Sequence, residues 1–121
     1  METTLNNKVL FLAGTGDART LAERLNPILM AHNAEIIVSV VSDNAAREYH
    51  TNRIPVRTGS MTLSQMKDFL ENENISLLID ATHPYAMEIS RNAMLAADDM
   101  NIPYIRYERP EVDVRDANYS E

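Results

Sequence analysis

Apolar residues gather in short runs along the chain, and polar residues or glycine bound each run. Three longer runs, at 8–13, 35–41 and 75–80, consist mainly of apolar residues. Continuous apolar runs of this length are typical of strands that are buried on both faces of a parallel sheet. Shorter runs at 55–57 and 104–107 predict two further strands.

The segments between these runs carry apolar residues at the spacing of an α-helix, with charged residues on the opposite side. One predicted helix begins at Asp17 and has Pro27 near its end. A second follows Thr62, which stands where a helix cap would. A third has Pro84 in its first turn. The stretch 45–53 is ambiguous and allows only a short helix.

The alternation of strand and helix with short connections predicts the fold class. We expect an α/β fold, a Rossmann-like open parallel sheet of about five strands with helices on both faces. The chain of 121 residues has room for one such domain, which we place at 1–110. Residues 111–121 carry four acidic residues and one basic residue. We interpret them as a tail or edge strand that starts a missing second domain.

The charge balance narrows the range of partners. The 18 Asp and Glu residues outnumber the 11 Lys and Arg residues, which gives a net charge of −7. This acidity argues against nucleic acid and against an anionic membrane surface as partners. Nine of the basic residues are arginine, whose planar fork matches carboxylates and phosphates. A local site for an anionic ligand therefore remains compatible with the overall charge.

The sequence contains no cysteine and three histidines. Disulfides, thiol nucleophiles and cysteine-bound metals are therefore excluded, and a cytoplasmic location is expected. The histidines lack metal-ligand spacing, so we expect no metal site. We expect neither a signal peptide nor a membrane span, because the N-terminus has no basic start and no apolar run is long enough.

Gly14-Thr15-Gly16-Asp17 follows the first predicted strand and opens the first predicted helix. Glycines at such a turn let the backbone approach a pyrophosphate, and the helix N-terminus offers free N–H groups. Arg19 stands where a G-x-G-x-x-G fingerprint has its third glycine. The loop fits a dinucleotide site, but glycine also occurs in such turns for steric reasons alone. Asp17 is either a helix cap or a ligand contact.

The loop after the next long strand would decide which nicotinamide cofactor binds. A carboxylate at this point typically binds a ribose hydroxyl of NAD, whereas an arginine accommodates the additional phosphate of NADP. Both Asp43 and Arg47 are present, and Asp43 is equally suited to a turn or a cap. The spacing alone leaves the choice of cofactor open.

The segment Asp80-Ala81-Thr82-His83-Pro84-Tyr85 brings an acid, a hydroxyl, an imidazole and a phenol to the edge where open α/β sheets bind ligands. Each has a structural alternative, with Asp80 bonded to backbone, His83 as a cap and Tyr85 as a packing residue. His83 lies beside the predicted cleft, whereas we interpret His32 and His50 as structural.

Four segments resemble one known family, the precorrin-6A reductases, including their cobalt-precorrin-6A form. They are 12–19, 78–86, 89–93 and 107–110, and they span most of 8–110. Asp80-Ala81-Thr82-His83-Pro84-Tyr85-Ala86 and Glu108-Arg109-Pro110 are more specific signals than the glycine loop. The resemblance implies an NADPH-dependent reduction of a ring double bond in a corrin precursor during vitamin B12 synthesis.

The resemblance also implies which residues contact the ligands. Those expected to contact NADPH are Gly14, Thr15, Gly16, Asp17, Ala18, Ser42, Arg47 and Thr82. His83 and Tyr85 are expected to contact the tetrapyrrole substrate, whose many carboxylates would suit Arg91, Arg106 or Arg109 if these face the cleft. The catalytic proton donor, and whether the substrate contains cobalt, remain open.

The chain also departs from the family pattern. Ala13 and Asp17 stand where the family usually has Gly and Glu, and Ser42 to Arg47 differ from its small-residue loop. Family members are longer, with a second α/β domain that closes the cleft, so this chain resembles their N-terminal half and is expected to be inactive alone. The alternative is a non-catalytic module that binds a nucleotide or a partner domain. An uncovered edge at the fifth strand also suggests a homodimer formed by strand pairing.

Overall fold

A computed structural model describes residues 7–49 and 53–108 of the chain. It contains one parallel sheet of five strands in the order β3-β2-β1-β4-β5. The strands are β1 (Asn7–Ala13), β2 (Ala34–Val40), β3 (Val56–Thr58), β4 (Ile75–Ala81) and β5 (Tyr104–Arg106). The sheet confirms the predicted α/β, Rossmann-like fold, and the apolar runs of the sequence lie where strands were expected.

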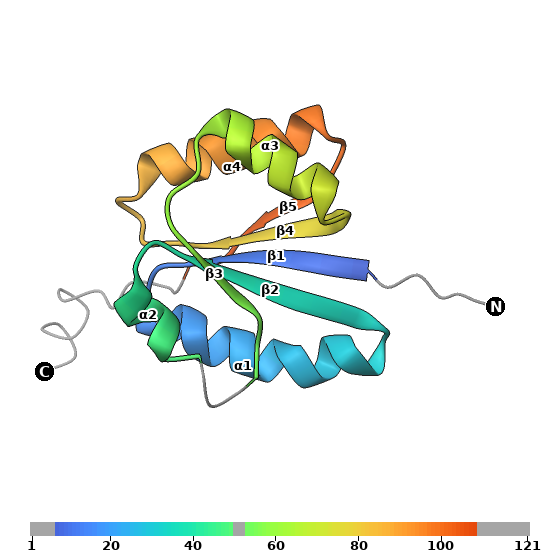
Figure 1. Cartoon of the computed structure of the whole chain (residues 1–121), viewed down its shortest axis with the longest axis vertical. Helices are drawn as coiled ribbons and strands as arrows, with labels where there is room; N and C mark the ends of the chain where they lie inside the picture. The colour runs from blue at the N-terminus through green and yellow to red at the C-terminus, as the bar shows by residue number, and fades with distance from the viewer. Residues whose placement is uncertain (1–6, 50–52, 109–121) are drawn as a thin grey trace, which may run out of the picture.

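Helices cover both faces of the sheet (Figure 1). They are α1 (Gly16–Ala31), α2 (Asp43–Arg47), α3 (Leu63–Asn72) and α4 (Met87–Asp99). Helices α3 and α4 lie together on one face, and α1 lies on the other with the short α2 near its N-terminal end. Among its described residues, the ambiguous stretch after β2 therefore contains one short helix, α2, which begins earlier than the sequence pattern indicated.

Two apolar cores result from this layering, and β1 contributes to both. Val9 and Phe11 point toward α1, whereas Leu10 and Leu12 point toward α3 and α4. All four side chains are at most 3% exposed. This burial on both faces explains why the strand is apolar at successive positions instead of alternating.

The helix starts agree only in part with the sequence prediction. Thr62 caps α3 as expected, and its capping box with Gln65 is complete. The prediction that Pro84 occupies the first turn of a helix is wrong, because α4 begins at Met87. Residues before it form a separate turn, in which the Ala86 N–H donates to the His83 carbonyl at 2.9 Å. Pro27 lies within the last turns of α1, near its end as expected.

Asparagines in the left-handed conformation follow three of the helices. Asn33, Asn74 and Asn101, which come two residues after α1, α3 and α4, have φ angles of 60°, 55° and 56°. Asparagine adopts this conformation more readily than most residues, and it satisfies the carbonyls at the helix end. An asparagine turn therefore ends each of these helices shortly before the next strand begins.

The predicted domain limit at 110 and the predicted tail at 111–121 lie outside the described residues, as does His50. Within the part that the structure describes, we find no helix with the length and apolar character that a membrane crossing needs.

Candidate functional site

The loops after β1 and β4 are in direct backbone contact at the carboxyl edge of the sheet. A Cβ atom added to Gly14 would lie 3.1 Å from both the His83 nitrogen and the Thr82 Cα. Contacts this short are tighter than most Cβ contacts, so a side chain at this position would have to push the two loops apart by a few tenths of an ångström. Gly14 therefore allows close packing between the two loops, in addition to the close approach to a ligand that the sequence suggested.

A pocket of about 330 Å³ opens beside the β1–α1 loop, and we call it the β2-side pocket. It is lined by Ala13, Gly14, Thr15, Gly16, Val40, Val41, Ser42, Ala45, Glu48 and Tyr49. Gly16 has open space on its side-chain face, where an added Cβ would meet nothing within 4 Å. Four residues predicted to contact a cofactor, at positions 14, 15, 16 and 42, therefore line one cavity.

The N-terminus of α1 lies at this pocket and is capped by Thr15, not by Asp17. The Thr15 hydroxyl oxygen accepts a 3.1 Å hydrogen bond from the Ala18 N–H. This bond occupies the amide of Ala18, whose side chain is fully buried in the core. Ala18 was predicted to contact a cofactor. In the structure its N–H bonds to Thr15 and its side chain packs in the core beneath the loop. Asp17 lies in the first turn of the helix.

Arg19 replaces the third glycine of the fingerprint and is held in ion pairs. Its guanidinium lies 2.9 Å from a Glu23 carboxylate oxygen and 3.6 Å from one of Glu48. Glu48 comes from the segment after α2, so these contacts join α1 to that segment. Tyr49, the next residue, is 2% exposed. Its burial is the main reason why the pKa of its phenol is raised to about 12, and the nearby charge of Glu48 adds to this effect.

The two predicted contacts at the end of β2 are placed differently. Ser42 lines the β2-side pocket and caps α2, accepting a 3.1 Å hydrogen bond from the Ala45 N–H. Arg47 is exposed, donates to the side chain of Asn44 and is not among the residues that line the pocket. Asp43 is the first residue of α2 and does not cap it, so the cap alternative given above is wrong for Asp43.

A second pocket, of about 170 Å³, lies on the other side of the β1–α1 loop, and we call it the β4-side pocket. It is lined by Thr15, Asp17, Ala81, Thr82, His83, Pro84, Tyr107 and Glu108. Thr15 lines both pockets, so they flank the same turn of backbone. The β4-side pocket lies at the β1–β4 boundary, where the sheet order reverses and where open α/β folds bind ligands, and the β2-side pocket lies next to it above β1 and β2.

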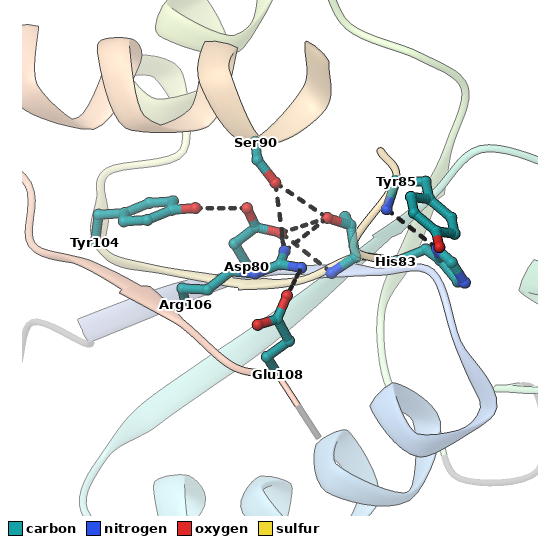
Figure 2. A network of polar contacts seen from close by, with 8 residues as sticks. Asp80, His83, Tyr85, Ser90, Tyr104, Arg106 and Glu108 are labelled. Atoms are coloured by element: carbon teal, nitrogen blue, oxygen red, sulfur yellow. Dashed lines mark hydrogen bonds and ion pairs between the residues drawn. The ribbon is translucent and has the colours of Figure 1, made fainter. Parts of the chain in front are cut away.

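Asp80 at the end of β4 organises a network of polar contacts next to this pocket (Figure 2). Its side chain is fully buried. The Oδ1 atom accepts hydrogen bonds from the Thr82 hydroxyl at 2.7 Å, the Thr82 N–H at 3.1 Å and Arg106 at 2.9 Å. The Oδ2 atom accepts one from the Tyr104 hydroxyl at 2.6 Å. Both carboxylate oxygens are therefore satisfied by groups from β4 and β5.

The network keeps Asp80 charged despite its burial. Burial favours the neutral acid, but hydrogen bonding by Ser90, Tyr104 and Thr82 outweighs it and lowers the pKa of the Asp80 carboxyl. Burial and the bond to Asp80 raise the pKa of the Tyr104 phenol, so this hydroxyl remains a donor. Arg106 supplies the opposite charge and also pairs with Glu108 at 3.1 Å.

The pairing of β4 with β5 explains how this network forms. Asp80 lies directly opposite Arg106 in the parallel register, and Leu78 lies opposite Tyr104. Residues two apart on a strand share a face, so Tyr104 and Arg106 both reach Asp80 from the same side of the sheet. Ser90 approaches from α4, where its hydroxyl lies 3.3 Å from that of Thr82.

His83 and Tyr85 lie together on the turn that follows β4. Their ring centroids are 5.0 Å apart with the planes tilted by 36°. The Tyr85 N–H donates a 3.1 Å hydrogen bond to Nδ1 of the His83 ring (Figure 2). The Tyr85 side chain is 86% exposed. His83 thus borders the β4-side pocket, whereas Tyr85 presents its ring to the outside.

A wide groove of about 760 Å³ runs between α4 and β5, and we call it the α4–β5 groove. It is lined by Pro84, Met87, Glu88, Ser90, Arg91, Asn92, Met94, Tyr104, Arg106 and Glu108. Met87 and Met94 are 73% and 49% exposed. Two of the three arginines considered for substrate carboxylates, Arg91 and Arg106, therefore face this groove, and Arg109 lies outside the described residues.

Several residues of the site were not predicted from sequence. Ser90 was expected only as part of the third predicted helix, and Tyr104 only as part of a strand. The signal that could have found Tyr104 is the two-residue spacing to Arg106, which matches Leu78 and Asp80 on the adjacent strand. Glu48 and Tyr49 were missed because the stretch after β2 gave no clear pattern.

An open parallel sheet with a glycine loop and two pockets at its carboxyl edge defines a Rossmann-like α/β domain. Residues 8–121 match the family model described as precorrin-6x reductase CbiJ/CobK. The chain therefore belongs to the precorrin-6x reductase family, as its motifs indicated.

Individual relatives agree with this assignment. The cobalt-precorrin-6A reductase of Priestia megaterium is 42% identical over 101 residues, which cover 84% of this chain and 38% of that protein. The precorrin-6A reductase of a Sinorhizobium species is 38% identical over 104 residues, which cover 86% of this chain and 38% of that protein. A solved structure titled CobK precorrin-6A reductase superposes with a TM-score of 0.66 at 27% identity, covering 88% of this chain and 41% of that one. The chain thus spans about two fifths of the length of these relatives.

Proposed function

We propose that this chain is the NADPH-binding half of a reductase that acts on a ring double bond of precorrin-6A or cobalt-precorrin-6A in cobalamin biosynthesis. The observation that carries the proposal is the pair of pockets that share Thr15 on either side of the Gly14–Gly16 loop. A dinucleotide consists of two nucleoside halves joined by a pyrophosphate. Two cavities that flank one glycine-containing turn match that shape.

The loop itself suits the pyrophosphate. Gly16 leaves open space on the surface of the turn, and it begins α1, whose N-terminus carries a partial positive charge. Thr15 fixes this helix end by capping it. We place the adenosine half in the β2-side pocket beside Ser42, and the nicotinamide half in the β4-side pocket beside Thr82 and His83. The bound cofactor would supply a hydride.

The choice of NADPH over NADH depends on α2. Arg47 lies on this helix and would have to release Asn44 to reach a phosphate on the ribose. Ser42 lines the pocket and offers a hydroxyl to the same phosphate. Glu48 lines the pocket as well, but its ion pair with Arg19 offsets its charge. Titration with NADPH and with NADH separates the two cofactors directly.

The substrate side of the proposal rests on the surface beyond α4. Tyr85 exposes an aromatic ring suited to stacking on a flat ligand, and the α4–β5 groove combines exposed methionines with Arg91 and Arg106. These features suit a large, flat molecule that carries carboxylates. Because the reductases named above are more than twice as long as the matched region, we expect this chain alone to bind the cofactor without reducing substrate.

The test is a fluorescence titration of NADPH with the wild-type chain and with Gly16→Val. A Cβ added at this position meets nothing within 4 Å, so we expect the valine side chain to occupy the space assigned to the pyrophosphate. We expect NADPH affinity to fall at least tenfold with little change in stability. Ala31→Val, at the exposed far end of α1, is the matched control and should bind normally. Unchanged affinity in Gly16→Val would contradict the proposed position of the cofactor, and no binding by the wild type would contradict the function.

A further inference from the structure

The His83 ring is held in one tautomer by the turn that contains it. Its Nδ1 atom accepts the hydrogen bond from the Tyr85 N–H at 3.1 Å. A ring nitrogen that accepts a hydrogen bond carries no proton, so this contact places the ring proton on Nε2. His83 can therefore donate one hydrogen bond through Nε2.

The backbone around His83 is fixed on both sides. The His83 carbonyl accepts the Ala86 N–H at 2.9 Å, which closes the turn before α4. On the other side, the His83 nitrogen lies where it would be 3.1 Å from a Cβ of Gly14, so the β1–α1 loop packs directly against it. The backbone that carries the ring is thus held in place beside the β4-side pocket.

The charges around this pocket limit what Nε2 can bind. Asp17 and Glu108 line the same cavity as His83, and Glu108 also pairs with Arg106 at 3.1 Å. Neither lysine nor arginine is among the lining residues, so a phosphate or carboxylate placed there would find no cationic side chain in the lining, which an uncharged carbonyl group does not need. A cavity of about 170 Å³ also has room for a single small ring with a substituent. These features favour a neutral, planar amide over an anionic group.

We propose that His83 donates a hydrogen bond through Nε2 to the carboxamide oxygen of the nicotinamide ring, and so orients that ring in the β4-side pocket. The inference rests on the proposed function, and it assigns His83 to the cofactor where the family resemblance assigned it to the substrate. His83 then acts as a positioning hydrogen-bond donor.

The experiment compares NADPH with 2′-phospho-ADP-ribose, which has the adenosine half and the pyrophosphate but no nicotinamide. In His83→Asn, the side-chain oxygen can accept the Tyr85 N–H as Nδ1 does, but nothing replaces Nε2. We expect this variant to bind NADPH about tenfold more weakly, the loss of about one hydrogen bond. Its affinity for 2′-phospho-ADP-ribose should equal that of the wild type.

The outcomes separate this inference from the proposed function. Equal weakening of both ligands in His83→Asn would assign His83 a purely structural role, and unchanged affinity for both would remove it from the site; either result overturns the inference while the cofactor site stands. Failure of the wild type to bind either ligand overturns the function and the inference together. Nitrogen NMR of the imidazole provides an independent check, and a proton on Nδ1 at neutral pH would also overturn the inference.

Discussion

The hydroxyl of Tyr104 on β5 donates a 2.6 Å hydrogen bond to the buried carboxylate of Asp80 on β4. The bond joins the edge strand to its neighbour at the end of the sheet where the pockets lie. Charge-assisted hydrogen bonds of this kind are stronger than those between neutral groups. The position of β5 therefore depends on the ionisation of one side chain.

This dependence predicts a loss of stability in acid. The pKa of Asp80 is lowered in the folded state, so the unfolded chain takes up the proton at a higher pH than the folded one. The stabilisation is present above the unfolded pKa of about 3.9 and is lost as the pH falls through the folded pKa. Urea unfolding at pH 7 and at a series of pH values below about 4 should show this decline.

Asp80→Asn should remove that part of the acid dependence. At pH 7 we expect the variant to be less stable by roughly 2–3 kcal/mol, because Arg106 and Tyr104 lose a charged acceptor. Asp98→Asn, at an exposed position of α4, is the control and should leave the stability nearly unchanged. If Asp80→Asn and the wild type decline in parallel below pH 4, another carboxyl controls the acid limb.

Tyr49 predicts a second transition, at alkaline pH. Burial raises the pKa of its phenol to about 12, above the value of about 10 for an exposed tyrosine. Its contribution to stability is therefore complete below pH 10 and declines as the pH rises from about 10 toward 12. Tyr49→Phe should flatten the curve in this range, whereas Tyr85→Phe, at an exposed site, should not. The test is to measure the unfolding free energy of the wild type and both variants across this pH range.

Two helix caps offer a matched pair of variants. Thr15 and Thr62 each accept a hydrogen bond of 3.1 Å from the N–H three residues on. Replacing either with alanine should cost about 1 kcal/mol of unfolding free energy. Only Thr15→Ala should also weaken NADPH binding, because Thr15 lines both pockets and Thr62 lines neither. If the two variants bind NADPH with equal affinity, the Thr15 side chain does not contribute to the ligand site.

The exposed edge of β5 predicts self-association. In the described sheet β5 pairs with β4 alone, and the Ile105 side chain is 50% exposed. An unpaired edge with an exposed apolar side chain favours pairing with another strand. We expect sedimentation to reveal dimers at high protein concentration, and Ile105→Lys to shift the chain to monomer. A wild-type chain that stays monomeric at all concentrations would argue against edge pairing.

The sequence indicated the sheet well because its central strands are buried on both faces. In β1 and β4 most side chains enter one of the two cores, so a continuous apolar run is the direct consequence of the fold. The helix ends were harder to place. Pro84 fits the first turn of a helix and a preceding turn equally well by sequence, and the hydrogen bonds of His83 decide for the turn.

The site was predictable where it depends on neighbours in sequence. The Gly14–Gly16 loop and the Thr82–Tyr85 segment could be recognised because each is local and lies at a strand end. The bond between Tyr104 and Asp80 could not, because these residues are 24 positions apart and meet only through strand register. Arg47 is the opposite case. The sequence pattern predicted that it contacts the cofactor, whereas in the structure its guanidinium donates to the Asn44 side chain.

The contact at Gly14 has a consequence for the kinetics of binding. Because the β1–α1 and β4–α4 loops pack so closely there that even a Cβ on Gly14 would be crowded, neither loop can move toward the other. A ligand that spans both loops meets a surface that is already formed in the folded chain. Binding therefore costs little conformational entropy of the loops. Association should then be governed by encounter and orientation, not by a slow rearrangement of the protein.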